Sequence, residues 1–181
     1  PKVDAGGSIG VKGATFTHRG TATDANGIAF IEWSKVVGPG QITFGRKNDL
    51  QTPVEANIDG IYHILLTVND AAGNTISDEI TFTWYTKPPE ITHSRVNAGV
   101  LGNNTLITMM VDDISPVTGQ LYYRPGGQRN FNMLPMREAG EKTLTAEISS
   151  DALETGVSYY LEATDEVGHS SKHPKDGADN P

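Results

Sequence analysis

Several short runs of this chain alternate apolar and polar residues with a period of two. Residues 80–85 read Ile-Thr-Phe-Thr-Trp-Tyr, and residues 62–68 read Tyr-His-Ile-Leu-Leu-Thr-Val. Successive side chains of a β-strand point to opposite faces of the sheet, so this pattern predicts strands with one buried face. Because helical periodicity is nearly absent, the alternation predicts an all-β fold.

Turn residues separate these runs. Asp24–Gly27, Gly38–Gly40 and Asp70–Gly73 are rich in glycine, proline, asparagine and aspartate, the residues that tight turns favour. Further strands are predicted at 106–111, 121–124, 131–136, 144–148 and 159–163. Short strands divided by turns at this spacing predict Greek-key β-sandwiches of the immunoglobulin-like (Ig-like) type.

A proline pair divides the chain of 181 residues near its middle. Pro88 and Pro89 cannot donate hydrogen bonds to a sheet, and they stiffen the backbone between folded parts. We therefore predict two tandem Ig-like domains, residues 1–86 and 91–173, joined by a linker at 87–90. The tail, 174–181, is expected to be a second linker, so that the chain is a fragment of a longer protein.

The largest apolar residues at alternating positions are candidates for the first core. We expect that core to contain Trp33, Tyr62, Leu66, Phe82 and Trp84. Tyr62 and Tyr159 each follow a glycine at the start of a strand. Both are expected to be tyrosine corners, in which the hydroxyl bonds to the backbone a few residues upstream.

Composition excludes several functions. The net charge is −8, and dividing the chain after Thr86 gives 6 basic against 9 acidic residues and then 8 against 13. Both halves are acidic, so neither nucleic acid nor an anionic membrane surface is an expected partner. The chain has no cysteine and no run of the roughly 20 apolar residues that a membrane helix needs. No nucleophile, phosphate-binding or zinc motif is recognisable, so the chain is not expected to be an enzyme.

Acidic turns suggest calcium. Two turns that an Ig-like sandwich brings to one end carry several oxygen ligands of the kind calcium prefers. In the second domain the candidate ligands are Asp112, Asp113, Asp165 and Glu166, and in the first they are Asp24, Asn26, Asp70 and Asn74. The alternative is ordinary hairpin chemistry, in which aspartate caps the turn and glycine takes the left-handed position. A calcium ion in the second domain would also stiffen the proline linker.

Aromatic residues offer a weaker alternative. A sugar platform needs exposed rings, and one tyrosine of each pair, Tyr122/Tyr123 and Tyr159/Tyr160, is expected to face outward on neighbouring strands. Such a pair more often supports the sheet. The five histidines lack metal-ligand spacing and are expected to be solvated or at interfaces.

Two segments carry a family resemblance. Residues 3–85 resemble the polycystic-kidney-disease-type (PKD-like) Ig-like domain of prokaryotic extracellular proteins, a resemblance carried by Ile31–Ser34, Gly38–Phe44 and Asp59–Gly73. One departure is Ser34–Val37, which stands where many members have Asp-Phe-Gly-Asp-Gly and a possible calcium turn. Residues 88–173 resemble a second Ig-like or fibronectin type III-like module, through 121–124, 134–136 and 159–165.

These resemblances imply an extracellular location, either secreted or on a cell surface. The expected function is that of a non-catalytic structural, adhesive or spacer module within a larger protein. Its expected partners are other domains of the same polypeptide, with a cell-surface protein or a polysaccharide as further candidates. The alternative is a carbohydrate-binding accessory region of a secreted polysaccharide-degrading enzyme.

Overall fold

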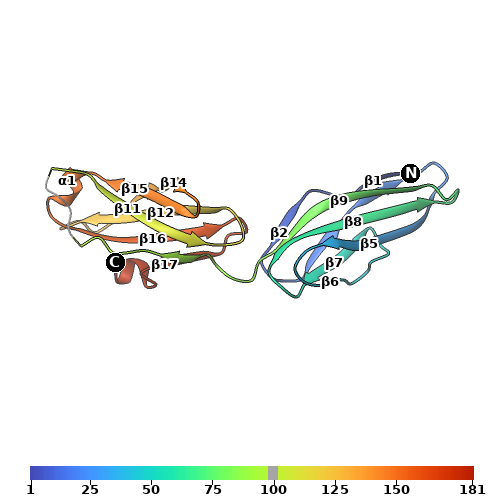
Figure 1. The fold of residues 1–181 in the computed structure, drawn as a ribbon, viewed down its shortest axis with the longest axis horizontal. Coiled ribbons are helices and arrows are strands. Elements are labelled where there is room, and N and C mark those ends of the chain that lie inside the picture. Colours follow the sequence, from blue (N-terminus) through green and yellow to red (C-terminus); the bar gives the residue numbers. More distant parts are fainter. Residues whose placement is uncertain (98–101) are drawn as a thin grey trace. The chain divides into compact units, whose positions relative to one another are not determined.

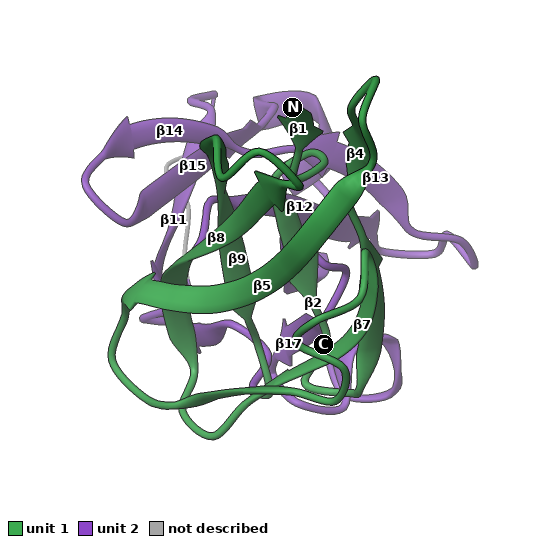
Figure 2. Ribbon diagram, turned by 90° about the vertical axis from the view of Figure 1, so that its right-hand side faces the viewer, with its two compact units in different colours: residues 1–86 green, residues 87–181 purple. Residues whose placement is uncertain are grey.

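The computed structural model describes residues 1–97 and 102–181, and its internal contacts divide it into two compact units, Pro1–Thr86 and Lys87–Pro181. Figure 2 distinguishes the units by colour, and each is a β-sandwich in the ribbon of Figure 1. The all-β, tandem Ig-like fold predicted from the alternation is confirmed.

The first unit has a four-stranded sheet in the order β2-β9-β8-β5 and a three-stranded sheet in the order β3-β7-β6, while β1 pairs with β4. The bounds are β1 Lys2–Asp4, β2 Ile9–Val11, β3 Phe16–Arg19, β4 Thr21–Thr23, β5 Ile28–Val37, β6 Ile42–Phe44, β7 Gln51–Ala56, β8 Gly60–Asp70 and β9 Thr75–Trp84. Strand β2 runs parallel to β9, and β8 pairs antiparallel with both β5 and β9.

Side chains from both sheets form the core of this unit. All five residues expected there are buried, with exposures of 0–6%, and Val54 from β7 packs with them. Strand β8 shows why the alternation of apolar and polar residues predicted the core correctly. Its residues are alternately buried and more exposed along most of its length, as a strand with one face on the core must be.

The second unit has sheets in the orders β10-β11-β15-β14 and β13-β12-β16-β17. The strand bounds are β10 Glu90–Thr92, β11 Thr105–Asp112, β12 Val117–Pro125, β13 Asn132–Pro135, β14 Arg137–Gly140, β15 Thr143–Ile148, β16 Val157–Asp165 and β17 Ser170–His173, and the helices are α1 Ser150–Leu153 and the 3-10 helix η1 Gly177–Asp179. Its core lies between the sheets, with Ile107 and Met109 from one and Leu121 and Leu161 from the other.

The strand predicted at 106–111 is β11, and its Leu106 and Met110 lie on the outer face, 54% and 56% exposed. One part of the second unit differs from the sequence analysis. The tail expected to be a linker, 174–181, instead contains η1, which packs against β16. Gly177 of this helix lies beside the Tyr160 ring, at a distance that would put an added Cβ in ordinary van der Waals contact with it, 3.6 Å away.

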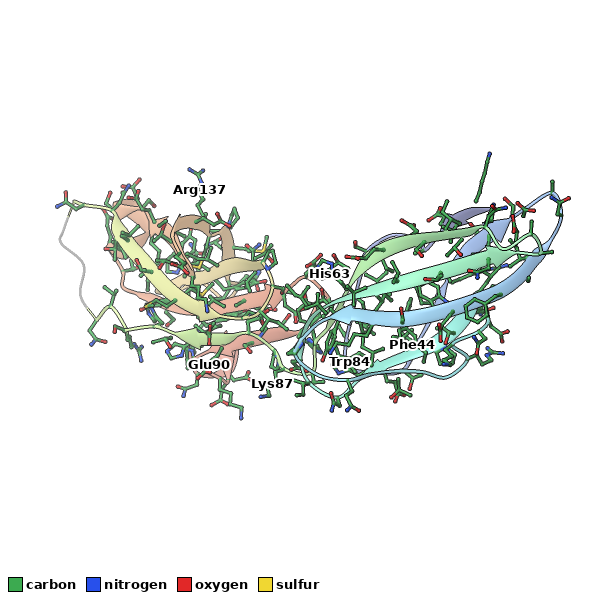
Figure 3. The ribbon with its side chains drawn as sticks, turned by 45° about the vertical axis from the view of Figure 1, so that its right-hand side comes forward. Phe44, His63, Trp84, Lys87, Glu90 and Arg137 are labelled. Carbon is green, nitrogen blue, oxygen red and sulfur yellow. The ribbon has the colours of Figure 1, made fainter. Side chains whose placement is uncertain are left out.

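Strand β14 forms the edge of one sheet. All four of its residues are exposed, and its pairing with β15 shifts register between Glu138 and Gly140. Arg137 projects from this strand away from the sandwich (Figure 3).

Candidate functional site

The turn between β8 and β9 is organised by the buried carboxylate of Asp70. Its Oδ1 accepts hydrogen bonds from the backbone N–H groups of Ala72 and Asn74, both at 2.9 Å, and its Oδ2 accepts one from the Asn74 side chain at 2.7 Å. These hydrogen bonds, led by that of the Asn74 side chain, hold the pKa of Asp70 below its ordinary value. Gly73 supplies the left-handed conformation, with φ of +87°. The arrangement is that of a hairpin cap.

Asp24 lies at the same end of the first sandwich as Asp70. Ile28, at the start of β5, is opposite Asp70 in the sheet, and the charge of Asp70 acts on Asp24. The Oδ1 of Asp24 accepts a hydrogen bond from the backbone N–H of Asn26 at 2.7 Å, and its Oδ2 lies 3.0 Å from the Pro1 ammonium. These two contacts, in that order, lower the pKa of Asp24. The side chain of Asn74 bonds to Asp70, and Asn26 is exposed.

The turn between β16 and β17 repeats the design of the first. Asp165 has a fully buried side chain, its Oδ1 accepts a hydrogen bond from the backbone N–H of His169, and its Oδ2 bonds to the His169 ring, both at 2.7 Å. Gly168 again has a left-handed conformation, with φ of +86°. In the two units, therefore, an Asp-x-x-Gly sequence followed by Asn or His makes the same cap.

The other acidic candidates of the second unit do not converge with Asp165 on a common site. The Oδ1 of Asp113 accepts hydrogen bonds from both the backbone and the hydroxyl of Ser115, each at 2.8 Å. Asp112 forms a close ion pair with Lys142, whose pKa is raised chiefly by that contact. Glu166 is exposed in the turn after Asp165.

The predicted calcium ligands therefore do not form a ligand set in either unit. Across residues 1–97 and 102–181, no three His, Cys, Asp or Glu side chains are grouped so that they could hold a metal ion. Four of the turn carboxylates, those of Asp24, Asp70, Asp113 and Asp165, instead accept hydrogen bonds from the backbone of their own turns, which is the hairpin alternative considered from the sequence. Calcium binding, as predicted from the sequence, would require these carboxylates to leave their present partners and regroup around the ion.

An aromatic cluster lies on the outer face of the β13-β12-β16-β17 sheet. The outward tyrosines are Tyr122 and Tyr160, which are directly opposite each other and stack with ring centroids 4.6 Å apart and planes 5° apart. The ring of Phe131 meets Tyr160 edge-on at 5.1 Å, and the Arg124 guanidinium lies 4.6 Å from the Phe131 centroid. Burial, followed by neighbouring negative charge, raises the pKa of Tyr122.

Most of this cluster is covered. Tyr160 is only 7% exposed, with the Lys172 ammonium 5.7 Å from its centroid and η1 beside it, whereas Met133 next to Tyr122 is 58% exposed. The stacked pair is consequently a cross-strand support whose exposed border is formed by Tyr122 and Met133.

Tyr62 is a tyrosine corner, as predicted. Its hydroxyl donates a 2.6 Å hydrogen bond to the carbonyl of Ile58, four residues upstream. Gly38, with φ of +143°, packs so closely against the ring that a Cβ there would overlap it. The prediction for Tyr159 was wrong in its partner, because the hydroxyl bonds to His93 and to the backbone N–H of Val96, more than 60 residues upstream.

The histidines make more hydrogen bonds and ring contacts than the sequence indicated. His18 is 5% exposed and bonds through Nε2 to the carbonyl of Ala5 at 2.6 Å, so the expectation of solvated histidines was wrong for this residue. His169 caps a turn, and His93 contacts both Tyr159 and His173. These partners are distant in sequence, and spacing along the chain gives no sign of them.

Comparison with solved structures supports the fold. An I-band fragment of titin superimposes with a TM-score of 0.50 at 14% identity, and the match covers 91% of this chain and 60% of that one. Fibronectin(III)-like modules of Clostridium thermocellum CbhA match with a TM-score of 0.45 at 14% identity, covering 94% of this chain and 89% of theirs. The PKD domain of the KIAA 1837 protein matches with a TM-score of 0.41 at 21% identity, covering 54% of this chain and 92% of that one. A search of curated protein sequences gave no match.

The topology and the likeness to the titin fragment define the class: two Ig-like β-sandwich domains in tandem. Residues 5–83, which make up most of the first unit, match the family model described as "K319L-like, PKD domain". Within the described residues, no helix has the length and apolar character required to cross a lipid bilayer.

Proposed function

We propose that this chain is a structural spacer or adhesive module of a larger secreted or cell-surface protein, with neighbouring domains of the same polypeptide as its main partners. The proposal is supported by how the polar groups are used. The buried carboxylates Asp70 and Asp165 each bond to their own turn. Each unit also has a core of its own, as a self-supporting segment of a stalk requires.

The strand pairing of the first unit is the observation that carries the spacer proposal. β2, near the start of the unit, lies parallel to β9 at its end, with Ile9 opposite Phe82 and Val11 opposite Trp84. Tension along the chain pulls β2 and β9 in opposite directions, so that their backbone hydrogen bonds are loaded together in shear. The second unit lacks this arrangement in its described strands, because β10 and β17 each pair antiparallel with a neighbour.

Mechanical unfolding of the whole chain tests the proposal. The chain is pulled from its two ends in an optical trap, and we expect two unfolding events, the first unit yielding at the higher force. The Trp33→Ala variant identifies the event of the first unit, because that residue lies in the core of this unit alone. If the first unit yields at a lower force than the second, the load-bearing role is refuted.

A carbohydrate-binding accessory role is the second candidate. It is favoured only by the partly exposed border of Tyr122 and Met133, beside Arg124. Retardation of the chain in polysaccharide-containing gels tests this role. Loss of retardation in Tyr122→Ala, with no loss in the control Phe30→Ala from the other unit, would support it. If the native chain migrates with unchanged mobility in every polysaccharide gel, the carbohydrate-binding role is refuted and the spacer role is the single remaining candidate.

A further inference from the structure

Two histidines of the second unit meet where its first and last segments reach the body of the sandwich. His93 follows β10, and His173 is the last residue of β17. Their ring centroids are 5.6 Å apart at an interplanar angle of 78°, and His93 also lies edge-on to Tyr159 of β16 at 5.7 Å.

The hydrogen bonds of His93 determine which of its ring nitrogens carries the hydrogen in the neutral ring. Its Nδ1 lies 2.6 Å from the carbonyl of Thr108 on β11, and a carbonyl only accepts, so Nδ1 carries the hydrogen. Its Nε2 lies 2.8 Å from the Tyr159 hydroxyl, which also accepts a hydrogen bond from the backbone N–H of Val96 at 2.9 Å. In the neutral ring Nε2 accepts the hydroxyl hydrogen of Tyr159, so the backbone N–H of Val96, the Tyr159 hydroxyl and the Nδ1–H of His93 each have an acceptor.

Protonation of His93 disturbs this arrangement in two ways. Nε2 would then carry a hydrogen and could no longer accept that of Tyr159, which would leave a largely buried hydroxyl donor without its partner. The ring would also become a cation facing His173. The groups around His93 are the Thr108 carbonyl from β11, Tyr159 from β16 and His173 from β17, and none of them is an anion at neutral pH.

Acidification also weakens the contribution of His173 to the stability of the folded state. Its pKa is lowered, first by burial and second by the charge of His93. A histidine whose pKa is lower in the folded state stabilises that state above its unfolded pKa of about 6.5, and the contribution is lost as the pH falls towards the folded value.

The same cluster holds both ends of the unit. Val96 is tied to Tyr159 and packs against the core, while the tail after His173 contains η1 and contacts the lead-in segment through the Arg95 guanidinium and the Pro181 carbonyl, 3.4 Å apart. We propose that His93, Tyr159 and His173 form an acid-sensitive latch, which fastens residues 93–97 and 174–181 to the sandwich at neutral pH and releases them when the histidines are protonated.

Hydrogen exchange of the whole chain between about pH 8 and pH 5 tests the latch, because histidine changes charge in this range. After correction for intrinsic rates, we expect protection of residues 93–97 and 174–181 to fall roughly tenfold or more on acidification. Protection of β11 and β16 should persist. If the protection of each segment is the same at the high and the low pH, the proposal is overturned.

Three variants separate the latch from general acid destabilisation. His173→Gln removes the facing cation, and Tyr159→Phe removes the hydroxyl but keeps the ring, so each should reduce the pH dependence of the two segments. His63→Gln, an exposed histidine of the first unit, should leave it unchanged. The same pH dependence in all three variants would refute the latch.

The tautomer provides a test that needs no variant. Ring nitrogen shifts of the native chain at neutral pH should show His93 with its hydrogen on Nδ1. A hydrogen on Nε2 would contradict the proposal directly.

Discussion

Removal of the Trp33 side chain should strongly destabilise the first unit. The indole is 1% exposed, lies edge-on to His18 at 5.3 Å, and donates a 2.9 Å hydrogen bond from Nε1 to the carbonyl of Asp49. Truncating a buried tryptophan to alanine costs about 3–5 kcal/mol. The whole stability of an 86-residue domain is roughly 4–13 kcal/mol, so Trp33→Ala removes a large share of it.

A matched variant separates packing from the hydrogen bond. Trp33→Phe keeps an aromatic ring but leaves the Asp49 carbonyl without its donor, and should cost about 1–2 kcal/mol. For a domain of this size, the expected fall in melting temperature is about 12 °C or more for alanine and roughly 4–16 °C for phenylalanine.

Thermal unfolding followed by circular dichroism measures both variants. The second unit contains neither of the two tryptophans, so its transition is an internal control and should not move. Fluorescence of the remaining Trp84 assigns the shifted transition to the first unit. An unchanged melting temperature in Trp33→Ala would refute the assignment of this residue to the core.

Three further predictions concern the corner and the turns. Tyr62→Phe loses the hydrogen bond to Ile58 and should destabilise the first unit by about 1 kcal/mol, measured by urea unfolding. The pKa of Asp70 lies below its usual 3.8, so this residue stabilises the folded state above that pH, and the stability is lost as the pH falls further. Acid unfolding followed by tryptophan fluorescence should therefore be shallower in Asp70→Asn, and identical curves would contradict the cap. Because Asp113 and Asp165 already accept hydrogen bonds, the second unit should melt at the same temperature in chelator and in millimolar calcium, and a higher temperature in calcium would show that its carboxylates regroup around the ion.

Alternation was a sufficient guide wherever a strand had one buried and one exposed face. The tryptophans and Tyr62 fell into the core because the period of two placed them on the buried side. Strand β14 gave no such signal, since all of its residues are exposed. The 3-10 helix at the end of the chain was missed for a similar reason, because short polar segments near a terminus show no periodicity.

The contacts of the candidate sites could be predicted only where they were local. The caps of Asp70 and Asp165 follow from turn chemistry within five residues. The partner of Tyr159 does not, because His93 lies 66 residues away and reaches it only after the two sheets have packed. Sequence spacing alone cannot distinguish a carboxylate used by its own turn from one available to an ion.

The exposed edge strand β14 has a consequence for a chain that carries sandwich domains in series. Covalently linked neighbours meet at high effective concentration, so during folding a bare strand edge in one domain is a template for mispairing with a strand from the next. A long, flat, apolar edge would favour such exchange. The edge here is four residues long, begins with Arg137 and Glu138, and is interrupted by the register shift before Gly140. These features oppose the addition of a foreign strand, and they allow adjacent domains to fold independently on one polypeptide.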